Sequence, residues 1–154
     1  MKKAPDYEKL KHRLESSKFS GSGFLGTDER PVDEIIADDL HQMEINQIDK
    51  DDLVDLLKIY YQKIRVEIGR RVRFTDNIYG EYHESMGRIP SPFIGDGVFE
   101  KGEAVIVNEK TGETFVITAL AINLIEKHDF FQGKGSRYRL DPVRLFHLFD
   151  ELEE

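Results

Sequence analysis

Apolar residues at helical spacing predict two helices in the first half of the chain. One begins at Pro31, because proline suits a first helical position, where its missing N–H would be unpaired anyway. The other runs from about 50 to 68, with Asp49 as its N-cap and Gly69 as its left-handed stop. The short link 45–48 favours antiparallel packing of the two helices. Their apolar stripes are Val32, Ile35, Ile36, Leu40 and Met43, then Leu53, Leu56, Leu57, Tyr60, Ile64 and Ile68.

Beyond the second helix the pattern changes to the alternation of polar and apolar residues that is typical of strands. Residues 71–75 suit a half-buried strand, which a turn joins to a return strand over residues 78–86. The return strand places Ile78, Tyr82 and Met86 on one side. The pattern therefore predicts a β-hairpin here.

More β-structure is predicted in the next forty residues. The stretch 87–97 is expected to be a loop, because its two prolines force extended backbone, and residues 98–101 suit a short strand. Residues 104–107 are continuously apolar, which predicts a strand buried on both faces. Asn108–Gly112 is a hairpin loop with glycine where a positive φ is wanted, and residues 113–118 return from it.

Two further helices are predicted towards the end of the chain. Thr118 can cap a helix over residues 119–127, which is apolar almost all round and should be largely buried. Asp141 can cap the last helix, which has Pro142 at its first position. The apolar face of this last helix consists of Leu145, Phe146, Leu148, Phe149 and Leu152.

Residues 1–30 are predicted to form a partly flexible N-terminal segment. Residues 7–17 suit a short helix with Leu10 and Leu14 on one side, and the glycines and serines of residues 19–26 suit a flexible connector. The connector is expected to dock on the body through its apolar residues, Phe19, Phe24 and Leu25.

The order of the elements predicts an α+β fold. Residues 31–154 are expected to form a single α+β domain: an N-terminal antiparallel helix pair, a central antiparallel sheet with hairpins, and two C-terminal helices packed on the sheet. A chain of 154 residues can bury roughly 70% of the surface that it exposes when unfolded, so a core is available without crosslinks.

Composition excludes several classes of protein. The absence of cysteine excludes a disulfide scaffold, a thiolate zinc site and a cysteine nucleophile, and it fits a reducing, cytoplasmic location. No apolar run is long enough for a membrane helix, and the basic start lacks the apolar core of a secretory signal, so no membrane association is expected. The net charge of −8 argues against bulk nucleic-acid binding.

Charge is distributed unevenly along the chain. Residues 27–55 contain eleven acids against Arg30 and Lys50, which gives −9, and residues 127–144 contain five cations against Asp129 and Asp141, which gives +3. The acids favour solvated faces and helix starts. They are also compatible with an acidic docking face, or with an acidic segment folded over a basic site.

The stretch 130–139 combines glycines, a serine, three cations and three aromatic residues. A nucleotide-binding P-loop is excluded, because His128 stands where the first glycine is needed. Three interpretations remain: a structural connector between two helices, an anion-binding loop, or a nucleic-acid patch in which Tyr138 stacks on a base. For the anion-binding loop the candidate ligand-binding residues are Lys134, Ser136, Arg137 and Arg139, with His83 and Arg88 if the predicted hairpin packs against the loop.

Several short motifs in the second half, within residues 87–142, resemble those of an uncharacterised prokaryotic protein family. The resemblance implies a prokaryotic cytosolic origin and brings no activity, cofactor or catalytic residue with it. The motifs that carry it are Gly87-Arg88-Ile89-Pro90 with Pro92 and Phe93, Asn108–Gly112, His128 with Phe130 and Phe131, Gly133–Ser136, and Arg139-Leu140.

No established catalytic or metal-binding motif is present in the sequence. The histidines lack zinc-ligand spacing, and His128 is expected to meet the last carbonyls of its helix. The pairs Asp38-Asp39 and Asp51-Asp52 diverge around their helices and are expected to be solvated, and the latter region lacks the glycine and the final acid of a calcium loop. No metal and no cofactor is therefore predicted.

Three functions follow from these observations. The first is a small acidic, non-catalytic interaction protein that binds another protein, or itself, through its helical face. The alternative is a binding domain or enzyme for a small phosphate- or carboxylate-bearing ligand at residues 133–139. Nucleic-acid binding through residues 127–144 ranks last.

Overall fold

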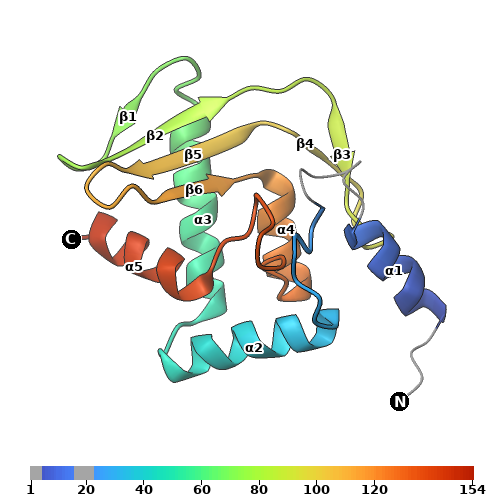
Figure 1. Cartoon of the computed structure of the whole chain (residues 1–154). Helices are drawn as coiled ribbons and strands as arrows, with labels where there is room; N and C mark the ends of the chain where they lie inside the picture. Colours follow the sequence, from blue (N-terminus) through green and yellow to red (C-terminus); the bar gives the residue numbers. More distant parts are fainter. Residues whose placement is uncertain (1–4, 16–22) are drawn as a thin grey trace.

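The structure is a computed structural model that describes residues 5–15 and 23–154 (Figure 1). Phe19 and the serines of the predicted connector lie outside the described residues. In order along the chain, the elements are α1 (Pro5–Glu15), α2 (Val32–Ile45), α3 (Lys50–Arg65), β1 (Val72–Arg73), β2 (Ile78–His83), β3 (Arg88–Pro90), β4 (Val98–Glu100), β5 (Glu103–Asn108), β6 (Thr114–Ile117), α4 (Ala119–His128) and α5 (Pro142–Leu152).

The described residues form a mixed α+β fold, as predicted, around a four-stranded antiparallel sheet of order β1-β2-β5-β6. β3 and β4 pair separately as a two-stranded ribbon. Figure 1 shows α3, α4 and α5 together below the sheet. The core therefore lies between these helices and one face of the sheet.

The side chains of β5 alternate between buried and half-buried positions, so the predicted burial of residues 104–107 on both faces is wrong. Ala104 and Ile106 face the helices and are fully buried, whereas Val105 and Val107 are only half-buried. The physical reason is that the helices cover one face of the sheet (Figure 1). The run of valine and isoleucine reflects β-propensity as well as burial.

The three predicted N-caps are confirmed, whereas the C-cap of α3 is Val66 and not the predicted Gly69. The side chain of Asp49 accepts hydrogen bonds from the backbone of α3, Thr118 caps α4, and Asp141 caps α5, which has Pro142 in its first turn. Helix α3 ends at Arg65, however, earlier than predicted. The last member of the predicted stripe, Ile68, is 48% exposed because it follows the helix.

Helix α2 crosses near the N-terminal end of α3 and does not run alongside it (Figure 1), which differs from the predicted antiparallel pair. Val32 and Ile35 of α2 pack against Leu120 and Leu124 of α4, and only the last turn, with Met43, joins the cluster around α3. The apolar stripe of α2 therefore packs mainly against α4, and not against α3 as the short link 45–48 predicted.

The core consists of two clusters. The larger lies between the sheet and helices α3, α4 and α5, and the smaller connects α1, α2 and α4. Leu14 of α1 and the connector residues Phe24 and Leu25 are buried in the smaller cluster. The predicted docking of the connector thus holds for its described part. Within residues 5–15 and 23–154, no helix combines the length and the apolar character that crossing a bilayer requires.

The segment after β2 differs from the prediction in two ways. The return strand ends at His83, so Met86 is 94% exposed and not on a buried face. Part of the predicted loop 87–97 is strand β3, in which Ile89 lies opposite Phe99. Extended backbone imposed by the prolines is compatible with a strand whose N–H groups are not all needed for pairing.

Candidate functional site

The glycine-rich loop between α4 and α5 lies against residues 23–28. The backbone N–H of Gly133 donates to the carbonyl of Phe24 at 2.8 Å, and that of Thr27 donates to the carbonyl of Lys134 at 3.0 Å. These bonds fix the loop on one side. The loop is therefore held in place by a segment more than a hundred positions earlier in the chain.

The glycines of this region permit a close approach of two backbones. A Cβ atom on Gly133 would lie 2.3 Å from the carbonyl oxygen of Leu25, and one on Gly26, whose φ is +59°, would lie 2.1 Å from the nitrogen of Ser136. Such distances leave no room for any side chain. The glycines are thus explained by chain packing, without an anion.

Ser136 is buried, and its hydroxyl contributes to the same packing. Its Oγ lies 3.1 Å from the carbonyl oxygen of Gly23 and 2.9 Å from Oε1 of Gln132. The predicted ligand-binding hydroxyl therefore already has two protein partners.

Arg139 forms a buried ion pair with Asp39 of α2. Two parallel bonds of 2.9 Å join the guanidinium to the carboxylate, and Nη1 also donates to the carbonyl of Gln132 at 2.7 Å. The side chains are only 12% and 7% exposed. Burial alone would lower the pKa of Arg139, but the hydrogen bonds and charges of Asp39 and Asp141 together outweigh it and raise the pKa. Arg139 therefore stays charged and serves the fold.

The prediction that Asp39 is solvated is wrong, and a signal for this exists in the sequence. Asp39 lies four residues after Ile35 and four before Met43, on the buried stripe of α2, whereas Leu40 is 37% exposed. An acid on an apolar helical face indicates a buried partner, since an unpaired buried charge is costly. The partner itself is a hundred residues away.

Arg137 and Tyr138 both bind Glu103 at the start of β5. Nη2 of Arg137 lies 2.8 Å from one carboxylate oxygen, and the hydroxyl of Tyr138 donates to the other at 2.5 Å. Burial and this carboxylate raise the pKa of Tyr138 to about 12. The tyrosine is thus engaged within the fold, and nothing in its contacts favours stacking on a base.

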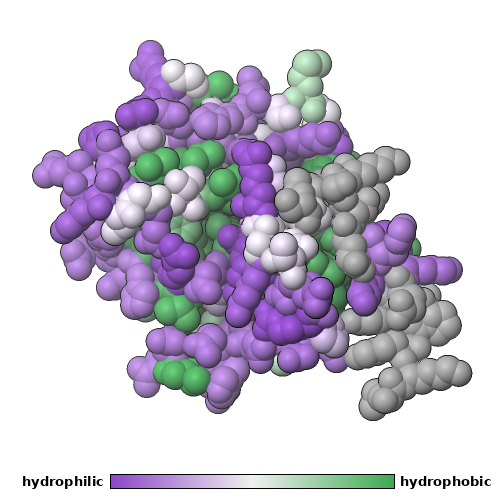
Figure 2. Space-filling view, in the orientation of Figure 1, coloured by the Kyte–Doolittle hydropathy of each residue, from purple (hydrophilic) through white to green (hydrophobic). Residues whose placement is uncertain are grey.

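Lys134 lies beside the edge strand β6, where it lines a hollow of about 280 Å³. Its backbone is held by Asp28 and Thr27, but its ammonium has no partner among residues 5–15 and 23–154. Figure 2 shows hydrophobic surface between β6 and α5, within mostly hydrophilic surroundings. The other lining residues are Thr114, Phe115, Arg139, Asp141 and Arg144. Arg144 is paired with Glu113.

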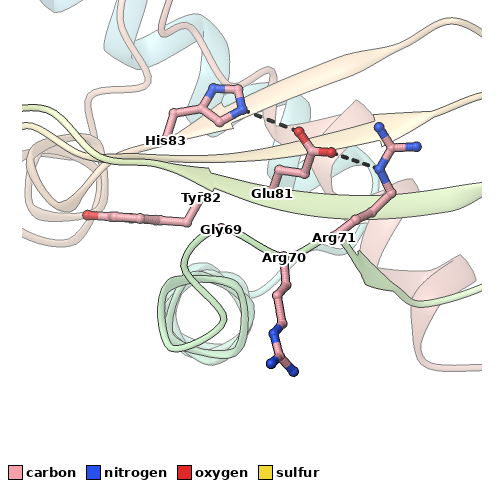
Figure 3. A pocket seen from close by; sticks show the side chains of 6 residues that line it. All are labelled: Gly69, Arg70, Arg71, Glu81, Tyr82 and His83. Carbon is pink, nitrogen blue, oxygen red and sulfur yellow. Dashed lines mark hydrogen bonds and ion pairs between the residues drawn. The ribbon is translucent and has the colours of Figure 1, made fainter.

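His83 lines a second hollow, of about 200 Å³, at the β1–β2 side of the sheet (Figure 3). Figure 3 shows His83 and Arg71 converging on Glu81, at 3.4 Å and 2.7 Å, while Arg70 points away. Hydrogen bonds from Arg71 and His83 lower the pKa of Glu81. The carboxylate thus neutralises much of the positive charge in this hollow.

The six predicted ligand-binding residues do not converge on one site. Lys134 and Arg139 share the hollow beside β6. His83 lines the hollow next to β1 and β2, and the strand order places β6 and β1 at opposite edges of the sheet. Arg88 lies on β3, in the separate two-stranded ribbon. Among the described residues, no hydrogen bond or ion pair joins His83 or Arg88 to the glycine-rich loop. The link between β2 and the loop runs through Glu103, which lies opposite His83 in the register of β2 with β5 and binds Arg137 and Tyr138.

A third hollow, of about 340 Å³, lies between α3 and α4. Its apolar lining comes from Tyr61, Phe99, Ala119 and Ile122, and its polar lining from Lys58, Gln62, Asn123 and Glu126. We call it the α3–α4 groove. An ion pair of 2.7 Å between Lys58 and Glu126 closes one part of its rim.

The turn between β3 and β4 contains a polar cluster that the sequence did not reveal. Oδ2 of Asp96 accepts hydrogen bonds from Ser91, Asn123 and His128, at 2.9, 2.8 and 2.8 Å. Burial alone would raise the pKa of Asp96, but these bonds outweigh it and lower the pKa. The ring of His128 therefore binds Asp96 and stacks on Phe93. The expectation that it meets the last carbonyls of its helix is wrong.

Searches against family models, curated proteins and solved structures find no match. The resemblance to an uncharacterised prokaryotic family stays a prediction. Among the residues that the structure describes, no group of three or more His, Asp or Glu side chains is placed to share a metal ion. The candidate sites are thus the α3–α4 groove and the hollow beside β6.

Proposed function

We propose that the protein is a non-catalytic interaction protein of the cytosol, and that a protein partner docks on the helical face formed by α3 and α4. The observation that carries this proposal is the α3–α4 groove, which combines an apolar floor with a polar rim. Such hollows, of about 300 Å³ or more and with a few polar groups, are the usual places where proteins bind ligands or side chains.

The acidic segment 27–55 supports a docking role because only part of it is used by the fold. Four of its acids bind groups within the protein, namely Asp28, Asp38, Asp39 and Asp49. Six others are exposed and have no partner for their side chains within the described residues: Glu29, Glu34, Glu44, Asp51, Asp52 and Asp55. Several of these lie at the N-terminal end of α3, one helix turn or more from the groove.

Exposed apolar side chains lie on α2 and α3, the helices that carry most of these acids. Ile45 at the end of α2 and Ile59 in the middle of α3 are among the largest exposed hydrophobic residues. Exposed apolar residues beside exposed acids on a helical surface fit an interface with a polar rim. Together these features favour a protein partner of positive charge.

The test compares two affinity-tagged proteins in a native lysate: the wild type and a double variant, Asp51→Lys with Asp55→Lys. We expect the wild type to capture a partner that the double variant loses. A second double variant, Asp150→Lys with Glu151→Lys on the exposed side of α5, makes the same charge change elsewhere and should still capture it. A strictly monomeric wild type by light scattering, with no captured partner, would contradict the proposal.

A second candidate function is the binding of a small anion in the hollow beside β6. The observation that favours it is the ammonium of Lys134, which lies next to Arg139 and Arg144 and has no partner in the described part of the chain. Of the other predicted residues, Ser136 and Arg137 have partners within the fold, and His83 and Arg88 lie outside this hollow.

The test of this second candidate is a melting-temperature screen with inorganic phosphate and phosphorylated metabolites. A ligand at 100 times its Kd adds about 2.7 kcal/mol of stability, which is easily seen as a shift. The shift should disappear in Lys134→Ala and persist in Lys110→Ala, which changes another exposed lysine. No shift with any of these anions would reject the candidate.

A further inference from the structure

We propose that the partner presents a basic amphipathic helix, which lies along α3 and α4 and inserts one apolar side chain into the α3–α4 groove. This inference rests on the function proposed above and names the chemistry of the partner.

One stripe of α3 continues the groove towards the N-terminal end of the helix. Lys58 and Gln62 line the groove, and Asp55 and Asp51 precede them at spacings of three and four residues, so all four lie on one side of the helix. At 1.5 Å per residue the stripe is about 16 Å long, which matches about three turns of a partner helix.

The charges on this stripe are paired at some positions and unpaired at others. On the stripe, Lys58 is neutralised by Glu126, and beside the stripe Lys50 is neutralised by Asp129, each at 2.7 Å. The carboxylates of Asp51 and Asp55 have no partner among the described residues. Cations on a docked helix can therefore pair with these two acids without breaking an existing ion pair.

The size and lining of the groove fit a side chain from a larger partner. A volume of about 340 Å³ lies at the lower end of the range for small-molecule pockets, about 300–1,000 Å³. Phe99 and Ala119 are half-buried, so the apolar floor is accessible from solvent. Helices docked in grooves supply such anchors at spacings of three and four residues.

The experiment measures the binding of labelled peptides to the full chain by fluorescence anisotropy. The first peptide is a helix of four turns with leucines on one face and lysines elsewhere, and the second has glutamate in place of each lysine. We expect the lysine peptide to bind and the glutamate peptide not to bind. The affinity should fall as salt increases, since the ion pairs are exposed.

Two variants test the site itself, each with a matched control. Asp51→Lys with Asp55→Lys should weaken binding of the lysine peptide by at least about tenfold, while Asp150→Lys with Glu151→Lys should not. Gln62→Trp places a bulky side chain over the groove from an exposed position that leaves the fold intact, and it should weaken binding similarly. Gln42→Trp, the same change on the exposed side of α2, should have no effect.

The inference is overturned if both charge-reversed variants weaken binding equally, if Gln62→Trp has no effect, or if the lysine peptide does not bind. Its failure is distinguishable from failure of the proposed function. A partner captured by the wild type and lost by Asp51→Lys with Asp55→Lys, without peptide binding, removes only the helical partner. Absence of any captured partner removes the function as well.

Discussion

The α3–α4 groove and the hollow beside β6 are both bordered by charged side chains, but they differ in what those side chains already contact. Beside β6, Arg139 is bound to Asp39 and Arg144 to Glu113, so most of the positive charge is neutralised within the fold. In the α3–α4 groove the charged lining residues, Lys58 and Glu126, also bind each other, but Asp51 and Asp55, on the stripe of α3 that leads away from the groove, have no partner among the described residues. A run of charge in a sequence indicates a binding site only where the fold leaves it without partners.

The largest expected effect is the loss of folding stability in Arg139→Ala, which tests whether this cation beside β6 is used by the fold. Arg139→Ala leaves Asp39 buried and unpaired, and removal of one member of a buried pair costs about 3–5 kcal/mol. Urea denaturation of Arg139→Ala should therefore show a large decrease in the free energy of unfolding. Arg137→Ala is the control, because Arg137 binds Glu103 from a side chain that is 57% exposed, and exposed pairs contribute about 1 kcal/mol or less.

Equal losses in these two variants would contradict the assignment of Arg139 to the fold. A double variant, Asp39→Leu with Arg139→Leu, sharpens the test. Replacement of a buried pair by apolar residues of similar size is often nearly neutral. The double variant should therefore be clearly more stable than Arg139→Ala.

The next effect tests whether the glycines of the loop serve chain packing. Gly133→Ala places a Cβ 2.3 Å from a backbone oxygen, and overpacking of this kind costs about 1–3 kcal/mol. Gly112→Ala meets no atom within 4 Å, so it carries only the cost of a left-handed residue, about 1–2 kcal/mol. Thermal and urea denaturation of the two variants should show a larger loss for Gly133→Ala. A loss in Gly133→Ala no larger than in Gly112→Ala would reopen the anion-binding explanation of the loop.

Local features of the fold could be predicted from the sequence, because their causes lie within a few residues. The caps Asp49, Thr118 and Asp141 are followed directly by their helices, and Gly112 has the positive φ that the hairpin turn requires. The α+β class followed from the same local signals. Boundaries such as the end of α3 were less well predicted, because tertiary contacts decide where the last turn ends.

The candidate site could be predicted only in part, because whether a polar side chain is free to bind a ligand depends on partners that are distant in the sequence. The sequence predicts ligand binding by Arg139 and Ser136, but in the structure they bind Asp39 and Gly23, which are about a hundred residues away. The α3–α4 groove was not predicted at all. Its floor combines residues of α3, β4 and α4, and no local pattern reveals such a combination.

A smaller effect concerns pH. Hydrogen bonds from Arg30, and from the backbone of Lys134 and Arg30, hold the pKa of Asp28 far below its usual value. Because the folded pKa is depressed, Asp28 stabilises the fold above its unfolded pKa of about 3.9, and this stabilisation is lost as the pH falls below that value. Asp28→Asn should therefore be less stable than the wild type at neutral pH.

The difference between Asp28→Asn and the wild type should narrow as the pH falls from about 5 to 2, which denaturation at several pH values can measure. Asp55→Asn is the matched control, since its side chain has no partner in the described structure. A constant difference across this range would show that the contact of Asp28 with the loop contributes nothing through its charge.

The smallest expected changes in stability are those caused by replacing exposed charged side chains, one from each region, that bind nothing among the described residues. Lys134→Ala and Asp55→Ala each remove an exposed charge with no partner among residues 5–15 and 23–154, and such surface substitutions usually change stability by about 0.5 kcal/mol or less. Denaturation of both variants should therefore coincide with that of the wild type. A charge that can be removed at no cost to the fold is free to bind something else, so a clear destabilisation by Asp55→Ala would weaken the case for the groove, and one by Lys134→Ala the case for the hollow.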